Sequence, residues 1–314
     1  MEYRTLGTTD LEIAPIVLGG NVFGWTADEK ASFRILDAAL DHGLNAIDTA
    51  DVYSAWVEGH EGGESETVIG KWFAARGPEV RDRIVLITKV GYQGGLSHDH
   101  IVEAAEASLR RLRTDRIDLY FSHKPDPDTP IEETLEAHQE LIEMGKVRWA
   151  GASNYDAEQL AAALEAGTGE SQARYCVLQP EYNLYARAGY ENGLQTVANR
   201  ENLGVIPYFA LAAGFLTGKY RSEEDFSRSA RGPGVKNRYW NDRGRRIVEA
   251  LDEVARESGT TPAQVALAWL RDRPTVTAPI ASATSVEQLE EIVAACELEL
   301  DEAAMERLEE ASGP

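Results

Sequence analysis

The chain has 314 residues, a usual length for a single α/β barrel, and its hydrophobic fraction of 43% is sufficient for a large core. It carries 31 basic and 53 acidic residues, a formal net charge of -22, so we expect no nucleic-acid or anionic-lipid partner. Only seven of the basic residues are lysines, and this acidic, lysine-poor composition suggests a salt-rich or high-GC source.

The N-terminal segment MEYRTLGTTD has no apolar run after a basic start, so no signal peptide is predicted. No stretch reaches the ~18 apolar residues that a membrane span needs. The two cysteines, Cys176 and Cys296, lack the spacing of metal ligands, and we expect structural thiols rather than a disulfide. The sequence therefore predicts a cytoplasmic protein with no membrane partner and no metal site.

In chain order, the first predicted element is a β-hairpin over residues 1–13, with Gly7 in its middle, that plugs the bottom of a barrel. Short β-rich runs then alternate with longer amphipathic runs. The β-rich runs are mostly continuous in apolar residues, which is typical of parallel strands buried on both faces. Eight strands are predicted, at residues 16–20, 45–49, 84–89, 117–121, 147–153, 175–179, 204–208 and 276–280.

The helices between these strands are predicted from apolar residues at helical spacing. They cover residues 27–42, 64–75, 98–112, 131–144, 156–166, 190–202, 263–271 and 285–295. Pro262 stands at the favoured first position of one of them, and Ser285 with Gln288 fits a capping box at the start of the last. A long loop at 211–242, a helix at 244–257 and a terminal helix at 301–311 are additional to the alternation.

Eight strands alternating with eight helices predict one (β/α)8 TIM barrel that forms a single domain over residues 1–314. The rival architecture is an open, doubly wound sheet. No G-x-G-x-x-G follows any predicted strand, so the usual dinucleotide signature of that rival is missing.

Four polar side chains stand at or just beyond the predicted strand ends, where barrel active sites lie. They are Asp48, Tyr53, Lys89 and His123. Taken singly, each also has an ordinary structural interpretation, as a loop cap, a solvated lysine or a satisfied histidine. Together they have a shared chemical logic, which favours a functional set.

That logic concerns a proton. Hydride transfer to a carbonyl leaves an alkoxide, and a tyrosine with its ordinary pKa of about 10 is a poor donor near neutrality. The Lys89 ammonium would lower the pKa of Tyr53, while the Asp48 carboxylate would keep Lys89 charged. His123 would donate a hydrogen bond to the carbonyl. These roles require no metal.

At this point the sequence resembles the aldo-keto reductase family, in particular its bacterial and potassium-channel β-subunit-like branches. The resemblance covers nearly the whole chain and rests on seven motifs in order: IDTADVYS (47–54), ITKVG (87–91), IDLYFSHKPD (117–126), GKVRWAGASNY (145–155), LQPEYNL (178–184), IPYFALAAGFLTGKY (206–220) and ASATSVEQLEE (281–291). It implies a catalytic tetrad of Asp48, Tyr53, Lys89 and His123. It further implies an oxidoreductase of EC 1.1.1 type that reduces small aldehydes or ketones to alcohols.

The resemblance also implies an extended nicotinamide cofactor across the barrel mouth. Ser153, Asn154 and Gln179 would hold the carboxamide, and Tyr208 would stack beneath the ring, although a core aromatic is the alternative for Tyr208. The remaining candidates for cofactor contacts are Asn21, Asp48, Phe209, Ala210, Leu211, Ala212, Ser282, Thr284, Gln288 and Glu291. Many relatives have serine where Phe209 stands, so only the backbone would contact phosphate there.

The choice between NADP(H) and NAD(H) depends on the adenosine 2′-phosphate. Thr284 and Ile292 stand where some relatives have basic residues and asparagine, which weakens the case for that phosphate. Lys219 and Arg231 match positions that clamp it in the channel-associated branch, although a mobile basic loop is an equal alternative for Arg231. NADP(H) is favoured, with NAD(H) kept as the alternative.

Trp25 and Trp56 follow the first two predicted barrel strands and are candidates for an apolar substrate wall, or for packing within their loops. His60 in the glycine-rich insertion 58–63 has no second histidine or cysteine near it and is not expected to bind a metal. A slowly turning NADPH-binding regulatory subunit is the second functional hypothesis, and a phosphate-binding barrel isomerase is the third. The sequence leaves open whether the chain forms a homo-oligomer.

Overall fold

The fold was analysed in a computed structural model, which describes residues 1–169 and 172–313. One parallel sheet has the strand order β10-β3-β4-β5-β6-β7-β8-β9. Its members are β3 (Val17–Gly19), β4 (Ala46–Asp48), β5 (Val85–Val90), β6 (Ile117–Ser122), β7 (Val147–Ser153), β8 (Tyr175–Gln179), β9 (Gly204–Val205) and β10 (Ile280–Ala281). Two contacts join the two edges of this sheet, β9 and β10. Val205 forms a bridge with Val276, and the Ile280 amide donates to the Pro207 carbonyl. The predicted (β/α)8 barrel is confirmed.

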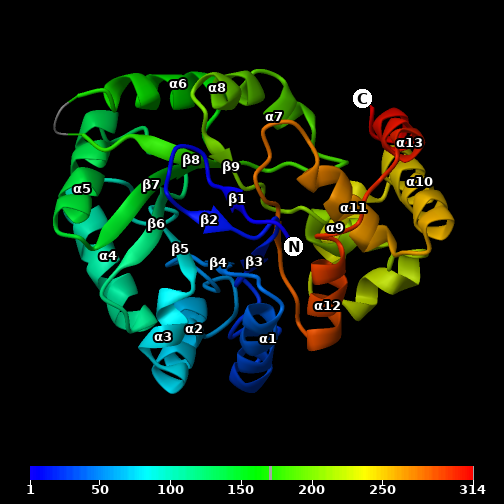
Figure 1. Ribbon diagram of the computed structural model, residues 1–314, viewed down its shortest axis with the longest axis horizontal. Helices are drawn as coiled ribbons and strands as arrows, with labels where there is room; N and C mark the ends of the chain where they lie inside the picture. The colour runs from blue at the N-terminus through cyan, green and yellow to red at the C-terminus, as the bar shows by residue number, and fades with distance from the viewer. Residues whose placement is uncertain (170–171, 314) are drawn as a thin grey trace.

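Helices surround the strands (Figure 1). The barrel helices are α1 (Glu29–Asp41), α2 (Glu64–Arg76), α4 (His98–Leu112), α5 (Ile131–Glu143), α6 (Ala157–Ala166), α8 (Leu194–Arg200), α11 (Pro262–Arg271) and α12 (Val286–Ala294). Each contacts the next around the ring, apart from α8 and α11, and α1 contacts α12. In the part of the chain that the structure describes, five further α-helices lie outside this ring or in its connections: α3 (Pro78–Asp82), α7 (Ala188–Glu191), α9 (Gly232–Tyr239), α10 (Asp242–Ser258) and α13 (Glu302–Ser312).

The predicted N-terminal hairpin is present as β1 (Arg4–Thr5) paired antiparallel with β2 (Glu12–Ile13). Leu6, Leu11 and Ile13 are buried with inward-facing strand residues such as Leu119 and Phe121. Because these apolar side chains belong to the same cluster as the barrel interior, the hairpin closes the end of the barrel opposite the strand C-termini.

Several predictions of element boundaries are wrong, among them the strand 204–208, which the structure limits to β9 (Gly204–Val205). The last strand is Ile280–Ala281 rather than 276–280, because Pro279 has no amide proton and Thr275 adopts a φ of +73°. The predicted helix 190–202 is divided into α7 and α8 by Gly193, whose φ is +107°. The predicted loop 211–242 contains α9 and two 3₁₀ helices, η1 (Ala212–Thr217) and η2 (Glu223–Arg228).

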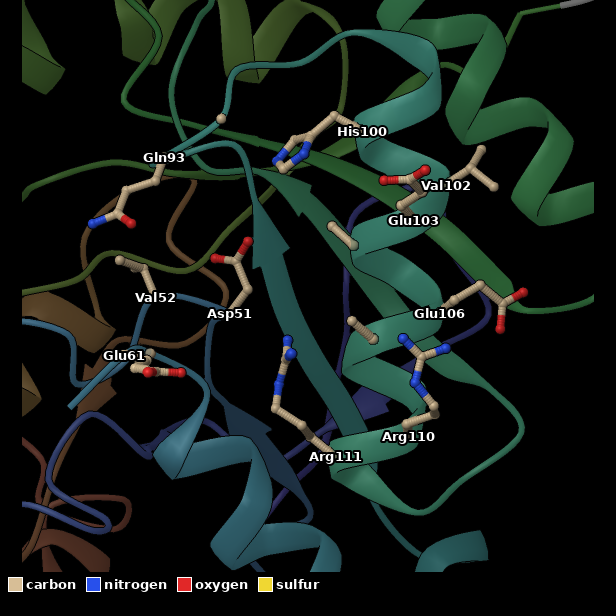
Figure 2. A pocket seen from close by; sticks show the side chains of 14 residues that line it. Asp51, Val52, Glu61, Gln93, His100, Val102, Glu103, Glu106, Arg110 and Arg111 are labelled. Atoms are coloured by element: carbon tan, nitrogen blue, oxygen red, sulfur yellow. The ribbon is translucent and has the colours of Figure 1, made fainter.

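Two cavities lie at the side of the barrel where the strands end. The larger, of about 920 Å³, is at the mouth of the barrel and is lined by residues of most of the strand ends. The second, of about 810 Å³, lies between α4 and the loop that follows β4 (Figure 2). Val52 and Gln93 line both cavities, so the two share a wall.

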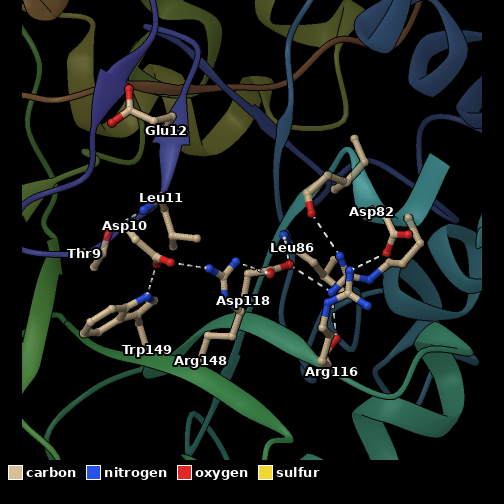
Figure 3. A network of polar contacts seen from close by, with 12 residues as sticks. Thr9, Asp10, Leu11, Glu12, Asp82, Leu86, Arg116, Asp118, Arg148 and Trp149 are labelled. Atoms are coloured by element: carbon tan, nitrogen blue, oxygen red, sulfur yellow. Dashed lines mark hydrogen bonds and ion pairs between the residues drawn. The ribbon is translucent and has the colours of Figure 1, made fainter. Parts of the chain in front are cut away.

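A network of charged groups joins the hairpin to the bottom of the barrel (Figure 3). Asp118 of β6 is 3% exposed and lies 2.9 Å from the guanidinium of Arg81 and 3.0 Å from that of Arg148. Arg148 also reaches Asp10 of the hairpin turn at 2.8 Å, and Trp149 donates to the same carboxylate at 2.8 Å. The buried Asp118 carboxylate is therefore neutralised by Arg81 and Arg148, which come from separate elements.

Candidate active site

The four predicted catalytic residues lie together at the mouth of the barrel. Asp48 is the last residue of β4, Lys89 is in β5, His123 directly follows β6, and Tyr53 is in the loop after β4. Asp48, Lys89 and His123 are 3%, 0% and 7% exposed, so the strand-borne members are buried. Parallel strands end at the same edge of a sheet, and this geometry brings together residues that are far apart in the sequence.

Lys89 is the centre of this group. Its ammonium nitrogen lies 2.8 Å from the Asp48 carboxylate, 2.8 Å from the Thr49 carbonyl oxygen and 3.2 Å from the Tyr53 hydroxyl. The Gln179 side-chain amide donates to Oδ1 of Asp48 at 2.8 Å, and Lys89 contacts both carboxylate oxygens. Asp48 therefore has one charged and one neutral donor, and Lys89 has three oxygen neighbours.

The electrostatic balance in this group differs from a simple lowering of the tyrosine pKa. Burial raises the pKa of Tyr53, and the neighbouring Lys89 ammonium opposes that rise. Burial disfavours the charged form of Lys89, but Asp48 and Tyr53 outweigh it and raise the lysine pKa above its usual range. Lys89 is thus a firmly charged ammonium that acts on Tyr53 in the predicted direction.

His123 is held in its neutral form. Burial, with the nearby Lys89 and Lys124 ammonium groups, lowers the pKa of His123 to about 2. Its ring centroid lies 6.1 Å from that of Tyr53 and 5.0 Å from that of Tyr92. Within the described residues its Nδ1 atom is buried without a hydrogen-bond partner. A neutral imidazole beside the tyrosine hydroxyl can donate one hydrogen bond to a carbonyl oxygen.

The candidates for the carboxamide site form one connected set of hydrogen bonds. Tyr208 donates to the side-chain oxygen of Asn154 at 2.7 Å, and the Asn154 amide donates to the His123 carbonyl at 2.8 Å. Ser153 donates to the carbonyl of Gln179 at 2.9 Å. Asn154 has a φ of +62°, a conformation that asparagine tolerates better than most residues. All four side chains line the larger cavity.

The segment after Tyr208 follows the edge of the same cavity. Phe209, Ala212 and Ala213 have φ values of +54°, +48° and +55°, and Gly214 has +91°. Phe209, Ala210 and Leu211 line the cavity, whereas Ala212 is fully buried and does not. These left-handed residues turn the chain sharply along the edge of the cavity, where the small residues Ala210, Ala213 and Gly214 line it together with Phe209 and Leu211.

The far end of the cavity is formed by the start of α12. Ser285 is the N-cap and accepts from the Gln288 amide at 3.3 Å, while the Gln288 side chain accepts from the Thr284 amide at 2.9 Å. The cap is confirmed, although Gln288 reaches one residue further back than the predicted box. Ser282 donates to Asn21 at 2.7 Å, and Glu291 accepts from Thr261 at 2.5 Å.

Lys219 and Arg231 also line the larger cavity. Neither makes an ion pair with any described residue, although the chain is strongly acidic. The guanidinium of Arg231 lies 5.1 Å from the centroid of Trp25, and burial lowers its pKa. The cavity therefore contains two cations that lack a counter-charge, which suits an anionic ligand.

The two candidate tryptophans pack edge to face, with ring centroids 5.5 Å apart, and Trp56 packs on Tyr53 at 5.7 Å. Trp56 is 49% exposed and lines the cavity, whereas Trp25 packs against Trp56 and is not among the residues that line the cavity. Sequence reasoning missed Tyr92, which is 50% exposed beside His123, and Gln93. Both follow Gly91 just past β5, so the same rule of strand ends could have found them.

Other kinds of site were sought in the described part of the chain. There, no three His, Cys, Asp or Glu side chains are grouped so that they could hold a metal ion. His60 instead makes a 3.0 Å hydrogen bond with Ser54. Among the helices of residues 1–169 and 172–313, none combines the length and apolarity that a membrane crossing requires. Cys176 and Cys296 are both free thiols.

Comparison with known proteins agrees with this geometry. The profile of the Aldo/keto reductase family matches residues 15–312. The uncharacterized oxidoreductase YrpG of Bacillus subtilis is 35% identical over 98% of this chain and 95% of its own. A probable voltage-gated potassium channel subunit beta of Arabidopsis thaliana is 35% identical over 93% and 90%. The aldo-keto reductase AMT2 of Alternaria alternata is 32% identical over 98% and 90%. The chain is an oxidoreductase that belongs to the aldo/keto reductase family.

Proposed function

We propose that this protein reduces small aldehydes or ketones to alcohols with NADP(H), and that Tyr53 is the proton donor. The observation that carries the proposal is the contact of one ammonium, on Lys89, with both the Asp48 carboxylate and the Tyr53 hydroxyl at the floor of the larger cavity. A charged lysine next to a phenol stabilises the phenolate that remains after proton donation.

The chain's own residues supply the acid chemistry. A substrate carbonyl oxygen between Tyr53 and His123 would accept a hydrogen bond from the neutral imidazole and the proton from the tyrosine hydroxyl. The phenolate that remains is stabilised by Lys89 and regains a proton from solvent. A bound nicotinamide cofactor would supply the hydride that the carbonyl carbon receives.

The residues at the cavity suit such a cofactor. Ser153, Asn154 and Gln179 present polar groups beside a flat Tyr208 ring, as a carboxamide and a nicotinamide ring require. The sharply turned segment after Tyr208 lines the cavity with several small residues that allow close approach of a ligand to backbone, and Lys219 and Arg231 provide unpaired positive charge for phosphates. The two cations favour NADP(H) over NAD(H), because the 2′-phosphate adds a dianion to the ligand.

The first test follows the absorbance of the reduced nicotinamide with purified protein and an aromatic aldehyde such as 4-nitrobenzaldehyde. NADPH and NADH are compared in parallel. Turnover that favours NADPH supports the reductase and the roles of Lys219 and Arg231 together. Turnover that favours NADH supports the reductase and contradicts the two phosphate contacts.

A second candidate is a cofactor-binding regulatory subunit that turns over slowly. The similarity to a protein named as a potassium channel subunit beta favours this candidate, since its identity equals that of the oxidoreductase relative. Tight NADPH binding without turnover on a broad panel of aldehydes and ketones would make it the better description. A small-molecule carbonyl partner and a cytoplasmic location remain parts of the first proposal.

A further inference from the structure

The second cavity contains an acidic side chain that the proposed mechanism does not use. Asp51 lies two residues before Tyr53 and points into the cavity between its own loop and α4 (Figure 2). Val52, the residue between them, lines both this cavity and the active-site cavity. The backbone amide of Asp51 donates to the carbonyl of Lys89 at 3.2 Å, so the segment is attached to the strand that carries the catalytic lysine.

Asp51 shares its surroundings with a second acidic group. Glu66 of α2 is 0% exposed, accepts from Thr88 at 2.6 Å and lies 2.7 Å from the guanidinium of Arg111. Thr88 directly precedes Lys89. Arg111 acts electrostatically on both carboxyl groups, so one guanidinium serves two acids. If both acids were ionised, the cluster would hold an uncompensated negative charge in a buried place.

Of the two carboxyl groups, that of Asp51 has fewer hydrogen bonds than that of Glu66. Among the described residues, its Oδ1 atom is buried without a hydrogen-bond partner, and so is the hydroxyl of the nearby Tyr120. Burial, followed by repulsion from Glu66, raises the pKa of Asp51 to about 7, against the opposing effects of Arg111 and Lys89. Asp51 therefore changes its charge close to neutral pH, whereas ordinary carboxyl groups do so near pH ~4.

Every element around Asp51 presents a charged or titratable group. α2 presents Glu66 and β5 presents Lys89, while β6 presents Tyr120. The titratable side chains of α4 and of the insertion 58–63 that line the cavity are His100, Glu103, Glu106, Arg110, Arg111 and Glu61. Glu106 is paired with Lys146. Burial is the main cause of the raised pKa of Asp51, and Glu66 is the titratable group that contributes most to it. Lys89 acts electrostatically on Asp51 and is also a member of the predicted tetrad.

The charge of Asp51 reaches Tyr53. Burial is the main cause that raises the pKa of the Tyr53 hydroxyl and Lys89 opposes it, while an ionised Asp51 makes a smaller contribution in the same direction as burial. A firmly held phenolic proton favours the form that donates to an alkoxide, and an easily lost one favours the phenolate that accepts a proton from an alcohol.

We propose that Asp51 is a positioning residue that sets the protonation of Tyr53 and thereby the pH at which the protein changes from carbonyl reduction to alcohol oxidation. The inference rests on the proposed role of Tyr53 as the proton donor. Asp51 donates no proton to substrate itself and acts only through the charge that it presents to the Lys89–Tyr53 pair.

The test uses Asp51→Asn, which keeps the shape and is neutral at every pH. Glu103→Gln is the matched control, because Glu103 lines the same cavity but is exposed. kcat is measured in both directions between about pH 4 and pH 11, a range that includes the ordinary carboxyl pKa of about 4 and extends past the ordinary tyrosine pKa of about 10. Loss of the negative charge at Asp51 should move the falling limb of reduction and the rising limb of oxidation to lower pH by about 0.5 to 1 unit.

Glu103→Gln should leave both limbs in place. An Asp51→Asn protein whose pH profiles superimpose on those of the unmodified protein would overturn the inference. Because Asn removes a buried charge, the variant should also melt at a higher temperature than the unmodified protein above neutral pH, which verifies that it folds.

A second readout does not depend on turnover. The pKa of Tyr53 is obtained from the ultraviolet absorbance of tyrosinate, as the difference between each protein and its Tyr53→Phe counterpart. A lower tyrosine pKa in Asp51→Asn supports the inference, and an unchanged one overturns it. Full activity of Tyr53→Phe would instead contradict the proposed function, so the two failures are distinguishable.

Discussion

The proposed reactivity of Tyr53 depends on residues from two strands. Its hydroxyl lies 3.2 Å from Lys89, and Lys89 is held in turn by Asp48 at 2.8 Å. The ring packs against Trp56 and faces His123. The ring contacts with Trp56 and His123 do not involve the hydroxyl, so removing the oxygen leaves the ring packed and tests chemistry rather than folding.

Tyr53→Phe is therefore expected to lower kcat for carbonyl reduction by about 10²- to 10⁴-fold, the usual contribution of a positioned acid. The dissociation constant of NADPH, measured by quenching of tryptophan fluorescence, should change little. Tyr3→Phe is the control, because Tyr3 is 47% exposed and donates only to the Gly43 carbonyl. Reduction at the unmodified rate in Tyr53→Phe would refute the role of proton donor.

The sequence located the four predicted catalytic residues, including Tyr53 in the loop after β4, but not the contacts that loop residues make. Asp48, Lys89 and His123 could be located because strand C-termini must meet at the barrel mouth. The same rule could have pointed to Tyr92, but the partners of Tyr92 and of the partly buried Asp51 depend on how the loops fold back. The Glu66–Arg111 pair joins two helices, a contact that no local pattern of the sequence predicts.

At the scale of elements, the hairpin depends on one close approach of backbones. Gly7 has a φ of +61°, and a Cβ atom there would lie 2.2 Å from the amide nitrogen of Gly204 and 2.7 Å from the carbonyl oxygen of Cys176. The turn of the hairpin is thus pressed against the beginnings of β8 and β9. Only glycine satisfies both the conformation and the space.

Gly7→Ala should lower the free energy of unfolding by more than about 2 kcal/mol, since it combines left-handed strain with a clash against backbone. Gly145→Ala is the matched control. Gly145 has a φ of +70° but nothing within 4 Å of its virtual Cβ, so only the conformational cost of about 1 kcal/mol applies. Urea denaturation followed by circular dichroism gives both values, and equal losses would contradict the close packing of the hairpin.

Elements with long regular patterns were predicted well, and short ones were not. The helix 98–112 agrees with α4 residue for residue, because five buried positions recur at helical spacing. β9 and β10 have two residues each. Pro207 follows β9 and Pro279 precedes β10, and the apolar runs of the sequence extend beyond the paired residues of both strands. The helices within 211–242 depend on tertiary contacts, such as the stacking of Phe226 on Tyr220, rather than on a strong local pattern.

At the scale of the whole molecule, the net charge of -22 opposes the compact state through repulsion between acidic groups. Many of the arginines are already engaged in ion pairs at the surface, which contribute little each. Dissolved salt screens the remaining repulsion over a distance of about 10 Å at 0.1 M and about 3 Å at 1 M.

We expect the melting temperature to rise by about 3 to 6 °C as sodium chloride increases from about 0.05 M to 1 M, because screening weakens the repulsion more than it weakens exposed ion pairs. Differential scanning fluorimetry measures this change. Sucrose at equal osmolality is the control for a general solute effect. A melting temperature that falls with salt would show that the ion pairs outweigh the repulsion and would contradict a salt-rich origin.

The ammonium of Lys89 has three hydrogens and three neighbours: Asp48, the Thr49 carbonyl and Tyr53. No hydrogen is left for a substrate, so whatever enters the cavity meets the lysine only through the tyrosine. The wall that a substrate of the proposed reaction would meet includes Trp56, which packs on the Tyr53 ring, and Tyr92, which packs on His123. An exchange of either aromatic residue would therefore change the packing of the proposed acid or of its neighbour together with the range of accepted molecules.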